Sequence, residues 1–236
     1  MTLVHVRDGA ELYGARVGIL HLPCRIPFAP GGVGHAATYR YPVVMRTIDC
    51  ADMASPEFEA RAVEAACWLE AQGVVAVTSD CGTLIRHQRA VAEAISVPVI
   101  LSPLLQLPLV IGAVGGPERV GIVAAVAENV DAEQLRLAGV AGADAGRIAI
   151  AGMQDQPAFR AAVLEEQGTL DTEAVGREAA DVARRLVAEH PRIRALVLDC
   201  SDLPPYAEAI RRATGRPVFD FVTMIDHAER AARGVG

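Results

Sequence analysis

Residues 76–100 read AVTSDCGTLIRHQRAVAEAISVPVI, and residues 195–219 read ALVLDCSDLPPYAEAIRRATGRPVF. Aligned without a gap, the two stretches share an Asp-Cys pair, which ends in Cys81 and in Cys200, and a Pro-Val pair near their last residues. The tetrapeptide Arg-Val-Gly-Ile also occurs twice, beginning at Arg16 and at Arg119. Because repetition along a sequence indicates repeated structure, we expect two related halves that each bring one thiol to an equivalent place.

The composition favours buried parallel strands. Of the 236 residues, 52% are hydrophobic but only 4% are aromatic, so the core must consist of Val, Ile, Leu and Ala. The net charge of -7 offers no basic surface for nucleic acid. The cysteines are five in number, without close pairing, and the polar N-terminal stretch does not resemble a secretory leader. We therefore expect free thiols in a reducing cytoplasm.

Apolar runs rich in β-branched residues alternate with helical patterns along the chain. The predicted strands cover residues 17–20, 42–48, 74–78, 97–101, 120–125, 148–151, 195–198 and 218–221. The predicted helices cover residues 55–71, 131–138, 157–166, 172–189 and 204–214, and the last begins at residue 223. This alternation predicts an α/β fold of two pseudosymmetric Rossmann-like halves, each a mostly parallel four-stranded sheet flanked by helices, with the active site in the cleft between them.

The helix at 55–71 has the clearest signals. Ser55 suits the N-cap, Pro56 suits the first helical position, and Gly73 is a good residue to end the helix. Between them, apolar residues recur at helical spacing, at Phe58, Ala62, Ala65, Ala66 and Leu69.

Gly115-Gly116-Pro117 is the expected boundary between the halves. Residues 1–115 would form the N-terminal half with Cys81, and residues 116–236 the C-terminal half with Cys200, with a C-terminal helix that can cross to the other half.

The uncharged run from residue 94 to residue 116 is long enough to cross a bilayer. Pro98, Pro103 and Pro108 interrupt it, and its first part repeats the strand predicted at 218–221. We therefore interpret it as a buried strand followed by a turn and a short helix, and we expect no membrane association.

Each Asp-Cys pair follows a predicted strand and precedes a predicted helix. Both thiols should therefore lie at the carboxyl edge of their sheets, where open α/β sheets bind ligands. The first backbone amides of the following helices, at Gly82, Thr83, Ser201 and Asp202, can hold a carboxylate and lower a thiol pKa. Such help matters because an ordinary thiol is only about 3% thiolate at pH 7.

Three aspartates accompany the thiols. Asp80 and Asp199 directly precede them and should point to the opposite side of the strand, so they are not expected to be catalytic. Asp202 lies in the turn after Cys200 and could relay a proton to or from that sulfur.

Other sites are poorly supported. Buried cysteines are often packing residues, but the paired placement of Cys81 and Cys200 favours chemistry for these two. Cys24, on the loop after the first predicted strand, is expected to line the cleft. The six histidines are scattered without metal-ligand spacing, and no metal site is expected.

The segments at 78–83 and 199–207 resemble the two cysteine motifs of the aspartate/glutamate racemase superfamily, which includes hydantoin racemases, maleate isomerases and arylmalonate decarboxylases. The resemblance extends over nearly the whole chain. It implies a cofactor-independent enzyme with a small carboxylate substrate held between the halves, and we expect a homo-oligomer. It also implies that Cys81 and Cys200 are the acid/base pair, one removing the proton next to the carboxylate and the other returning one from the opposite face.

Carried over by position, the resemblance implies that Gly82, Thr83 and Ser201 hold substrate oxygens. We also expect Ser79 and Asp202, which lie close to the two cysteines in sequence, to bind the substrate. Pro23 and Cys24 would line the pocket on the loop after the first strand. Amino-acid racemases commonly have Asp-Ser-Gly at that loop and Cys-Thr-His at the second motif. Here the chain has His-Leu-Pro-Cys-Arg and Cys-Ser-Asp, so Arg25 is a candidate clamp for the carboxylate.

Three functions remain open from the sequence. The main reading is a racemase or isomerase that transfers a proton at the carbon α to a carboxylate. The second is a decarboxylase or C–X lyase that uses the same enolate chemistry, and the two retained thiols weigh mildly toward the racemase. The third is a small-molecule binding or regulatory protein on this fold, in which Cys81→Ser would leave ligand affinity intact.

Overall fold

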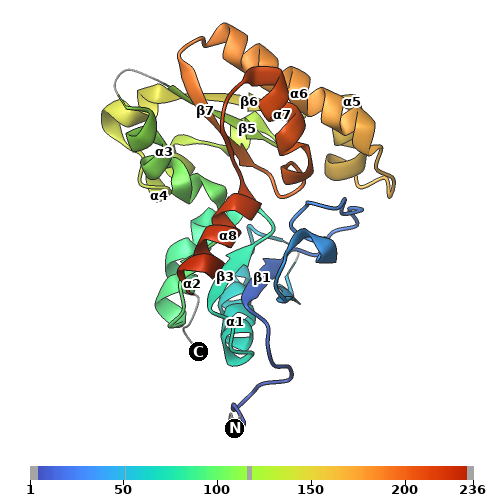
Figure 1. Ribbon diagram of the computed structural model, residues 1–236. Coiled ribbons are helices and arrows are strands. Elements are labelled where there is room, and N and C mark those ends of the chain that lie inside the picture. Colours follow the sequence, from blue (N-terminus) through green and yellow to red (C-terminus); the bar gives the residue numbers. More distant parts are fainter. Residues whose placement is uncertain (1–4, 51, 116–118, 233–236) are drawn as a thin grey trace.

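Two four-stranded sheets form the molecule, and every strand pair in them is parallel. The computed structural model describes residues 5–50, 52–115 and 119–232. The first sheet has the order β2-β1-β3-β4, and the second has the equivalent order β6-β5-β7-β8. Figure 1 shows the two sheets in separate halves of the molecule. Their strands are β1 (Val17–His21), β2 (Val43–Thr47), β3 (Ala76–Ser79), β4 (Val99–Ile100), β5 (Arg119–Ala124), β6 (Ile148–Gly152), β7 (Ile193–Asp199) and β8 (Val218–Phe219). The predicted α/β fold with two pseudosymmetric halves is confirmed.

Helices cover both faces of each sheet, and each face contributes to its own apolar cluster. They are α1 (Phe58–Ala71), α2 (Gln88–Ala94), α3 (Leu107–Val114), α4 (Ala132–Leu137), α5 (Pro157–Phe159), α6 (Thr172–Glu189), α7 (Ala207–Thr214) and α8 (Phe221–Ala231). Short 3₁₀ turns at Gly82–His87, Pro103–Gln106 and Pro204–Tyr206 lead into α2, α3 and α7. A π-helical turn at Arg160–Leu164 continues α5, where the sequence predicted one regular helix.

The repeated Arg-Val-Gly-Ile segment has a packing role in the central strand of each sheet. A Cβ on Gly18 would lie 3.0 Å from Leu69 of α1, and one on Gly121 would lie 2.6 Å from Leu196 and 3.1 Å from Leu186 of α6. The glycines therefore let the covering helix and the neighbouring strand approach the central strand closely.

Helix α1 buries the apolar stripe that the sequence predicts, and Gly73 follows its end with a φ of +80°. The predicted start at Ser55 is wrong, because the helix begins at Phe58. The Ser55 hydroxyl instead accepts the amide of Glu57, 3.2 Å away, in a turn that precedes the helix.

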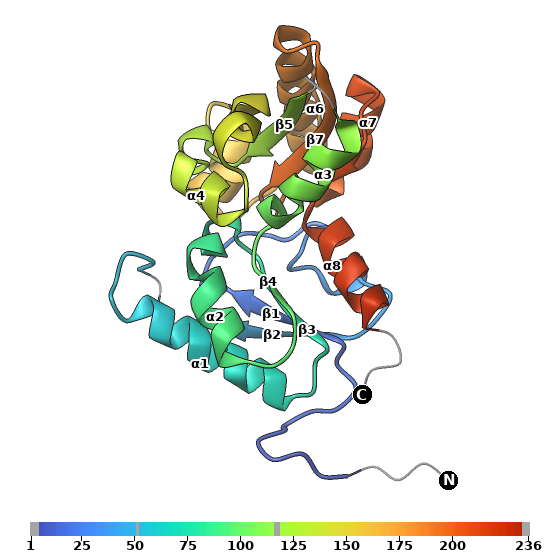
Figure 2. The same ribbon diagram turned by 90° about the vertical axis from the view of Figure 1, so that its left-hand side faces the viewer.

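The two halves exchange helices. Helix α3 follows the first sheet in sequence but buries Val110 and Ile111 against Val120 and Ile122 of the second sheet. Helix α8 ends the second half and packs on the first sheet, as Figure 2 shows from the side. Its start is fixed by a capping box, in which the Asp220 carboxylate accepts the amide of Thr223 at 2.8 Å.

This exchange ties the halves into one body, since each sheet is covered in part by a helix that follows the other sheet in the chain. The predicted boundary between residues 115 and 116 falls beside residues 116–118, which lie outside the described residues. The uncharged run before it forms β4, a 3₁₀ turn and α3. In the described parts of the chain, no helix is long and apolar enough to cross a membrane.

Candidate functional site

The two repeated cysteines follow equivalent strands at the carboxyl edges of the two sheets. Strand β3 ends at Ser79, two residues before Cys81, and β7 ends at Asp199, directly before Cys200. Both cysteines line one cavity of about 280 Å³, formed by loops of both halves. The ionised form of Cys81 would raise the pKa of Cys200, because like charges in one cavity repel each other.

Most of the predicted substrate-binding residues line this cavity, namely Pro23, Cys24, Gly82, Thr83, Ser201 and Asp202. Cys24 is a third thiol in the wall. Burial, and then the charges of Asp80, Asp202 and Glu166, raise its pKa, and an interaction with the Ile26 backbone partly opposes the rise.

Ser79 and Arg25 are not among the residues that line the cavity. The Ser79 side chain is fully buried; its hydroxyl donates to the carbonyl of Leu101 and accepts the amide of Cys81 at 3.3 Å. It therefore holds the backbone of Cys81 in place. Arg25 is exposed, and its backbone amide donates to Glu166 at 2.9 Å.

Asp80 and Asp199 do line the cavity, contrary to the expectation that they point away from it. Side chains alternate only while a strand continues. Strand β3 ends one residue before Asp80 and β7 ends at Asp199, so the alternation no longer applies. The Asp80 carboxylate contacts the His21 ring and accepts the amide of Leu22 at 3.1 Å. Asp80 thereby anchors the end of β1 and the loop that carries Cys24.

Asp199 joins the two halves. Its Oδ1 accepts the hydroxyl of Ser102 at 3.1 Å, and a Cβ on Gly82 would lie only 2.2 Å from the same oxygen. The Cys-Gly sequence at the end of β3 is therefore required by a carboxylate that comes from β7. No signal in the sequence near Gly82 indicates this contact.

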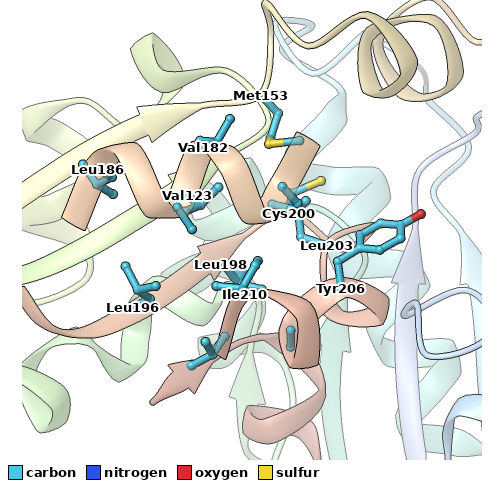
Figure 3. Close-up of a cluster of buried hydrophobic side chains, with 14 of the residues drawn as sticks. Val123, Met153, Val182, Leu186, Leu196, Leu198, Cys200, Leu203, Tyr206 and Ile210 are labelled. Atoms are coloured by element: carbon cyan, nitrogen blue, oxygen red, sulfur yellow. The ribbon is translucent and has the colours of Figure 1, made fainter. Parts of the chain in front are cut away.

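Burial has the largest effect on the pKa of both thiols. It raises the pKa of Cys81 to about 11, although the backbone amide and the hydroxyl of Thr83 both lower it. Burial, and then the nearby charge of Asp202, raise the pKa of Cys200 well above its ordinary value. Cys200 belongs to an apolar cluster with Met153, Leu203 and Tyr206, which explains its poor solvation (Figure 3).

Burial also raises the pKa values of two carboxyl groups in the site. Burial raises the pKa of Asp199 to about 7, against a lowering contribution from the Ser102 hydroxyl. Burial and the charge of Asp80 raise the pKa of Asp202 to about 6, while the Ser201 hydroxyl and the Cys200 thiol lower it. The Cys200 Sγ lies 3.9 Å from Asp202 Oδ2, so these two groups can share a proton.

The buried Asp199 predicts a pH-dependent stability. Its pKa is raised in the folded state, so the native protein binds more protons than the unfolded one between about pH 4 and pH 7, and its stability falls as pH rises through this window. We expect Asp199→Asn, which keeps the shape without the charge, to raise the free energy of unfolding by ~2–4 kcal/mol at pH 8. At pH 4 the substitution should change the free energy of unfolding little. Urea unfolding at both pH values measures this free energy, and an equal effect of the substitution at pH 4 and pH 8 would contradict the prediction.

The cavity wall is acidic. Asp80, Asp199, Asp202 and Glu166 line it, and no Lys or Arg does so among the described residues. Glu166 and Phe28 were missed in the sequence, because no motif or periodicity marks either of them. Glu166 is the non-glycine residue with positive φ, +48°, in the described chain, and it follows the π-helical turn at Arg160–Leu164. Both features are common at functional sites.

The residues of the site do not form a metal centre. In the described ranges, no three His, Cys, Asp or Glu side chains are placed to hold a metal ion.

The relatives that match this chain in sequence are named as lyases. The chain is 31% identical over 222 residues to a dimethylsulfoniopropionate lyase of Durusdinium sp. clade D, covering 90% of this chain and 73% of that protein. It is 32% identical over 220 residues to dimethylsulfoniopropionate lyase 7 of Emiliania huxleyi, covering 88% of this chain and 64% of that protein. The chain spans 60–64% of the length of three such relatives from this alga. No family model matches the sequence.

Solved structures with the same fold are racemases and a decarboxylase. Unliganded arylmalonate decarboxylase matches with a TM-score of 0.62 at 19% identity, covering 94% of both chains. Allantoin racemase from Klebsiella pneumoniae matches with a TM-score of 0.63 at 15% identity, covering 92% of this chain and 87% of that one. Glutamate racemase from Francisella tularensis matches with a TM-score of 0.53 at 17% identity, covering 92% and 79%. The resemblance to the aspartate/glutamate racemase superfamily is thus confirmed in the fold.

Proposed function

The chain belongs to the family of the dimethylsulfoniopropionate lyases, and we propose that it is itself a lyase that eliminates a sulfide from a β-sulfonio carboxylate such as dimethylsulfoniopropionate. The observation that carries the proposal is the cavity itself, in which Cys81 and Cys200 from equivalent strand ends share one space of about 280 Å³. The acidic wall supports a substrate with a cationic group.

The family membership favours elimination over the racemase reading, which was the main expectation from the sequence. The relatives are lyases by name, and the structures that match are too distant in sequence to say more than the fold. The two retained thiols do not argue against elimination, because proton removal from the carbon α to a carboxylate is the first step of both reactions.

The reaction that we propose has one proton transfer and one bond cleavage. A thiolate removes a proton from the carbon α to the carboxylate, and that electron pair forms the Cα=Cβ bond. The C–S bond breaks with its electron pair on sulfur, so that dimethyl sulfide leaves as a neutral molecule. The products are acrylate, dimethyl sulfide and a proton, which passes from the thiol to water before the next turnover.

Cys81 is the better candidate for the base. At Cys81 the Thr83 amide stabilises the thiolate more than the charge of Asp80 disfavours it, and the Thr83 hydroxyl helps. At Cys200 the charge of Asp202 outweighs the backbone contact that stabilises the thiolate. At pH 8 a thiol with a pKa near 11 is about 0.1% thiolate. A bound sulfonium would increase this fraction, because a positive charge in the cavity favours the ionised sulfur. Cys200 then stays protonated and acts as a hydrogen-bond donor. Its contact with Asp202 holds the side chain in position.

Backbone amides can hold the carboxylate of the substrate. Gly82 begins the 3₁₀ turn after Cys81, where the first N–H groups have no acceptor within the turn, and Ser201 directly follows Cys200 in the cavity wall. A carboxylate held at these amides would lie in the cavity that both cysteines line.

The test is a direct assay of the purified protein with dimethylsulfoniopropionate. We expect dimethyl sulfide in the headspace, measured by gas chromatography, and one acrylate for each sulfide, measured by proton NMR. Exchange of the α hydrogen in heavy water without loss of the substrate or of an amino acid from a panel would instead favour the racemase. Binding without turnover or exchange would favour the binding protein.

The pH dependence of the reaction identifies the base. If Cys81 is the base, the thiolate fraction rises tenfold per pH unit below its pKa, so kcat/KM should rise about tenfold per unit from pH 7 to pH 9. If Asp199 or Asp202 were the base, kcat/KM would level off above about pH 7. A rate profile, corrected for the uncatalysed alkaline elimination, separates the two.

A further inference from the structure

Phe28 and Glu166 line the cavity and have no role in the proposed proton transfer. Phe28 belongs to the loop after β1, and Glu166 follows the π-helical turn of the second half. The loops meet through the hydrogen bond from the Arg25 amide to the Glu166 Oε2 at 2.9 Å. Both side chains line the same cavity as the two cysteines.

The Phe28 ring is held in a fixed place. Its centroid lies 6.0 Å from that of the His21 ring, in an edge-on arrangement. On another side the ring lies on Gly34, where an added Cβ would be 2.7 Å from three ring carbons. A side chain at position 34 would therefore displace the ring from the cavity wall.

Glu166 brings a partly buried carboxylate to the cavity in a left-handed backbone conformation, with a φ of +48°. Glycine and asparagine adopt this region more readily than glutamate does, so local backbone preference does not explain this residue. Its Oε2 accepts the Arg25 amide. The charge of Glu166 is not neutralised by an arginine or lysine in the wall among the described residues.

The other acids of the wall are less suited to bind a cation. Asp80 contacts the His21 ring, and Asp199 is buried against Gly82 and Ser102. Asp202 contacts the Cys200 thiol. Glu166, whose loop contacts the loop after β1 through the Arg25 amide, is the acid of the wall without such a partner in the catalytic centre.

We propose that Phe28 and Glu166 form the subsite for the cationic end of the substrate and set its specificity for a sulfonium or quaternary ammonium group. This inference rests on the proposed function and deepens it. The ring face attracts the methyl groups around a positive centre, and the carboxylate adds a full negative charge. The carboxylate end of the substrate then lies at Gly82 and Ser201, with the reacting carbon between the two subsites.

Two carboxylates of the same shape test the subsite without turnover. 3-(Trimethylammonio)propionate carries a cationic end, and 4,4-dimethylpentanoate carries a neutral end of the same size. By titration calorimetry we expect the wild type to bind the cation about tenfold more tightly than the neutral compound. Glu166→Gln should reduce this preference to about twofold, and Phe28→Leu should also weaken it.

Glu165→Gln is the matched control, because Glu165 lies one residue away, pairs with Arg160 at 3.1 Å and does not line the cavity. It should keep the full preference. Glu166→Gly also removes the charge, and glycine adopts the backbone conformation of position 166 without strain. A loss of the preference for the cationic compound in this variant therefore cannot come from backbone strain.

Equal affinity of the wild type for the two compounds, binding of neither, or an undiminished preference in both Glu166 variants would overturn the subsite. The proposed reaction can fail while the subsite holds. In that case the wild type would release no dimethyl sulfide but would still bind the cationic compound more tightly than the neutral one.

Discussion

Replacing Cys81 with alanine is expected to lower kcat/KM for dimethyl sulfide release by about 10³-fold, because it removes the base that takes the α proton. The fold should tolerate the change, since Cys81 lies at the edge of an apolar cluster and its side chain is small. Headspace gas chromatography measures the rate, and thermal unfolding shows whether the variant is folded.

Two other thiols provide the comparison. Cys67→Ala is the matched control, because Cys67 is exposed on α1 and does not line the cavity, and its activity should equal that of the wild type. Cys200→Ala should lower kcat/KM less than Cys81→Ala, by about 10- to 100-fold, because Cys200 only donates a hydrogen bond in the proposed step. A folded Cys81→Ala variant within tenfold of the wild type would remove the proposed base from the mechanism.

Gly82→Ala is expected to be the most damaging single-methyl change in the site. The added Cβ would lie 2.2 Å from the Asp199 Oδ1, so either the turn or the carboxylate must move. We expect the free energy of unfolding to fall by ~1–3 kcal/mol. We also expect kcat/KM to fall by about 10²-fold, since the turn positions the Cys81 thiol. Urea denaturation and the sulfide assay measure the two effects.

Gly112→Ala is the control for this change, because Gly112 lies on α3 with no atom within 4 Å of an added Cβ. It should stabilise the protein by ~0.5–1 kcal/mol, as Gly→Ala does in an exposed helix. In a double-mutant cycle, Asp199→Ala should recover much of the stability that Gly82→Ala loses, since it removes the colliding carboxyl. Additive effects of the two substitutions would show that the collision is not the cause.

The fold was largely predictable from local patterns. All eight strands were predicted near their observed positions, because β-branched apolar runs between turn residues have few other stable arrangements. Helix α6 was predicted with its observed bounds, from Thr172 to Glu189. The errors lie where local signals compete, as at Ser55, whose hydroxyl stabilises a turn before the helix.

The candidate site was predictable only in part. The residues that follow each cysteine could be placed at the cavity because they come after the equivalent strand in each repeat, and their contact with a substrate stays a prediction. Arg25 was assigned as a carboxylate clamp from its chemistry, but its side chain does not line the cavity. The expected homo-oligomer and the cytoplasmic location stay predictions.

The sequence by itself determined two parallel α/β halves with a thiol at the carboxyl edge of each sheet, because hydrophobic periodicity and turn residues act over short stretches of chain. Only the tertiary structure decided that Asp199 presses against Gly82, that α3 packs on the second sheet, and that Glu166 reaches the cavity of the cysteines. These contacts join segments far apart in the chain. They follow from how whole helices and sheets pack, and no local pattern specifies that packing.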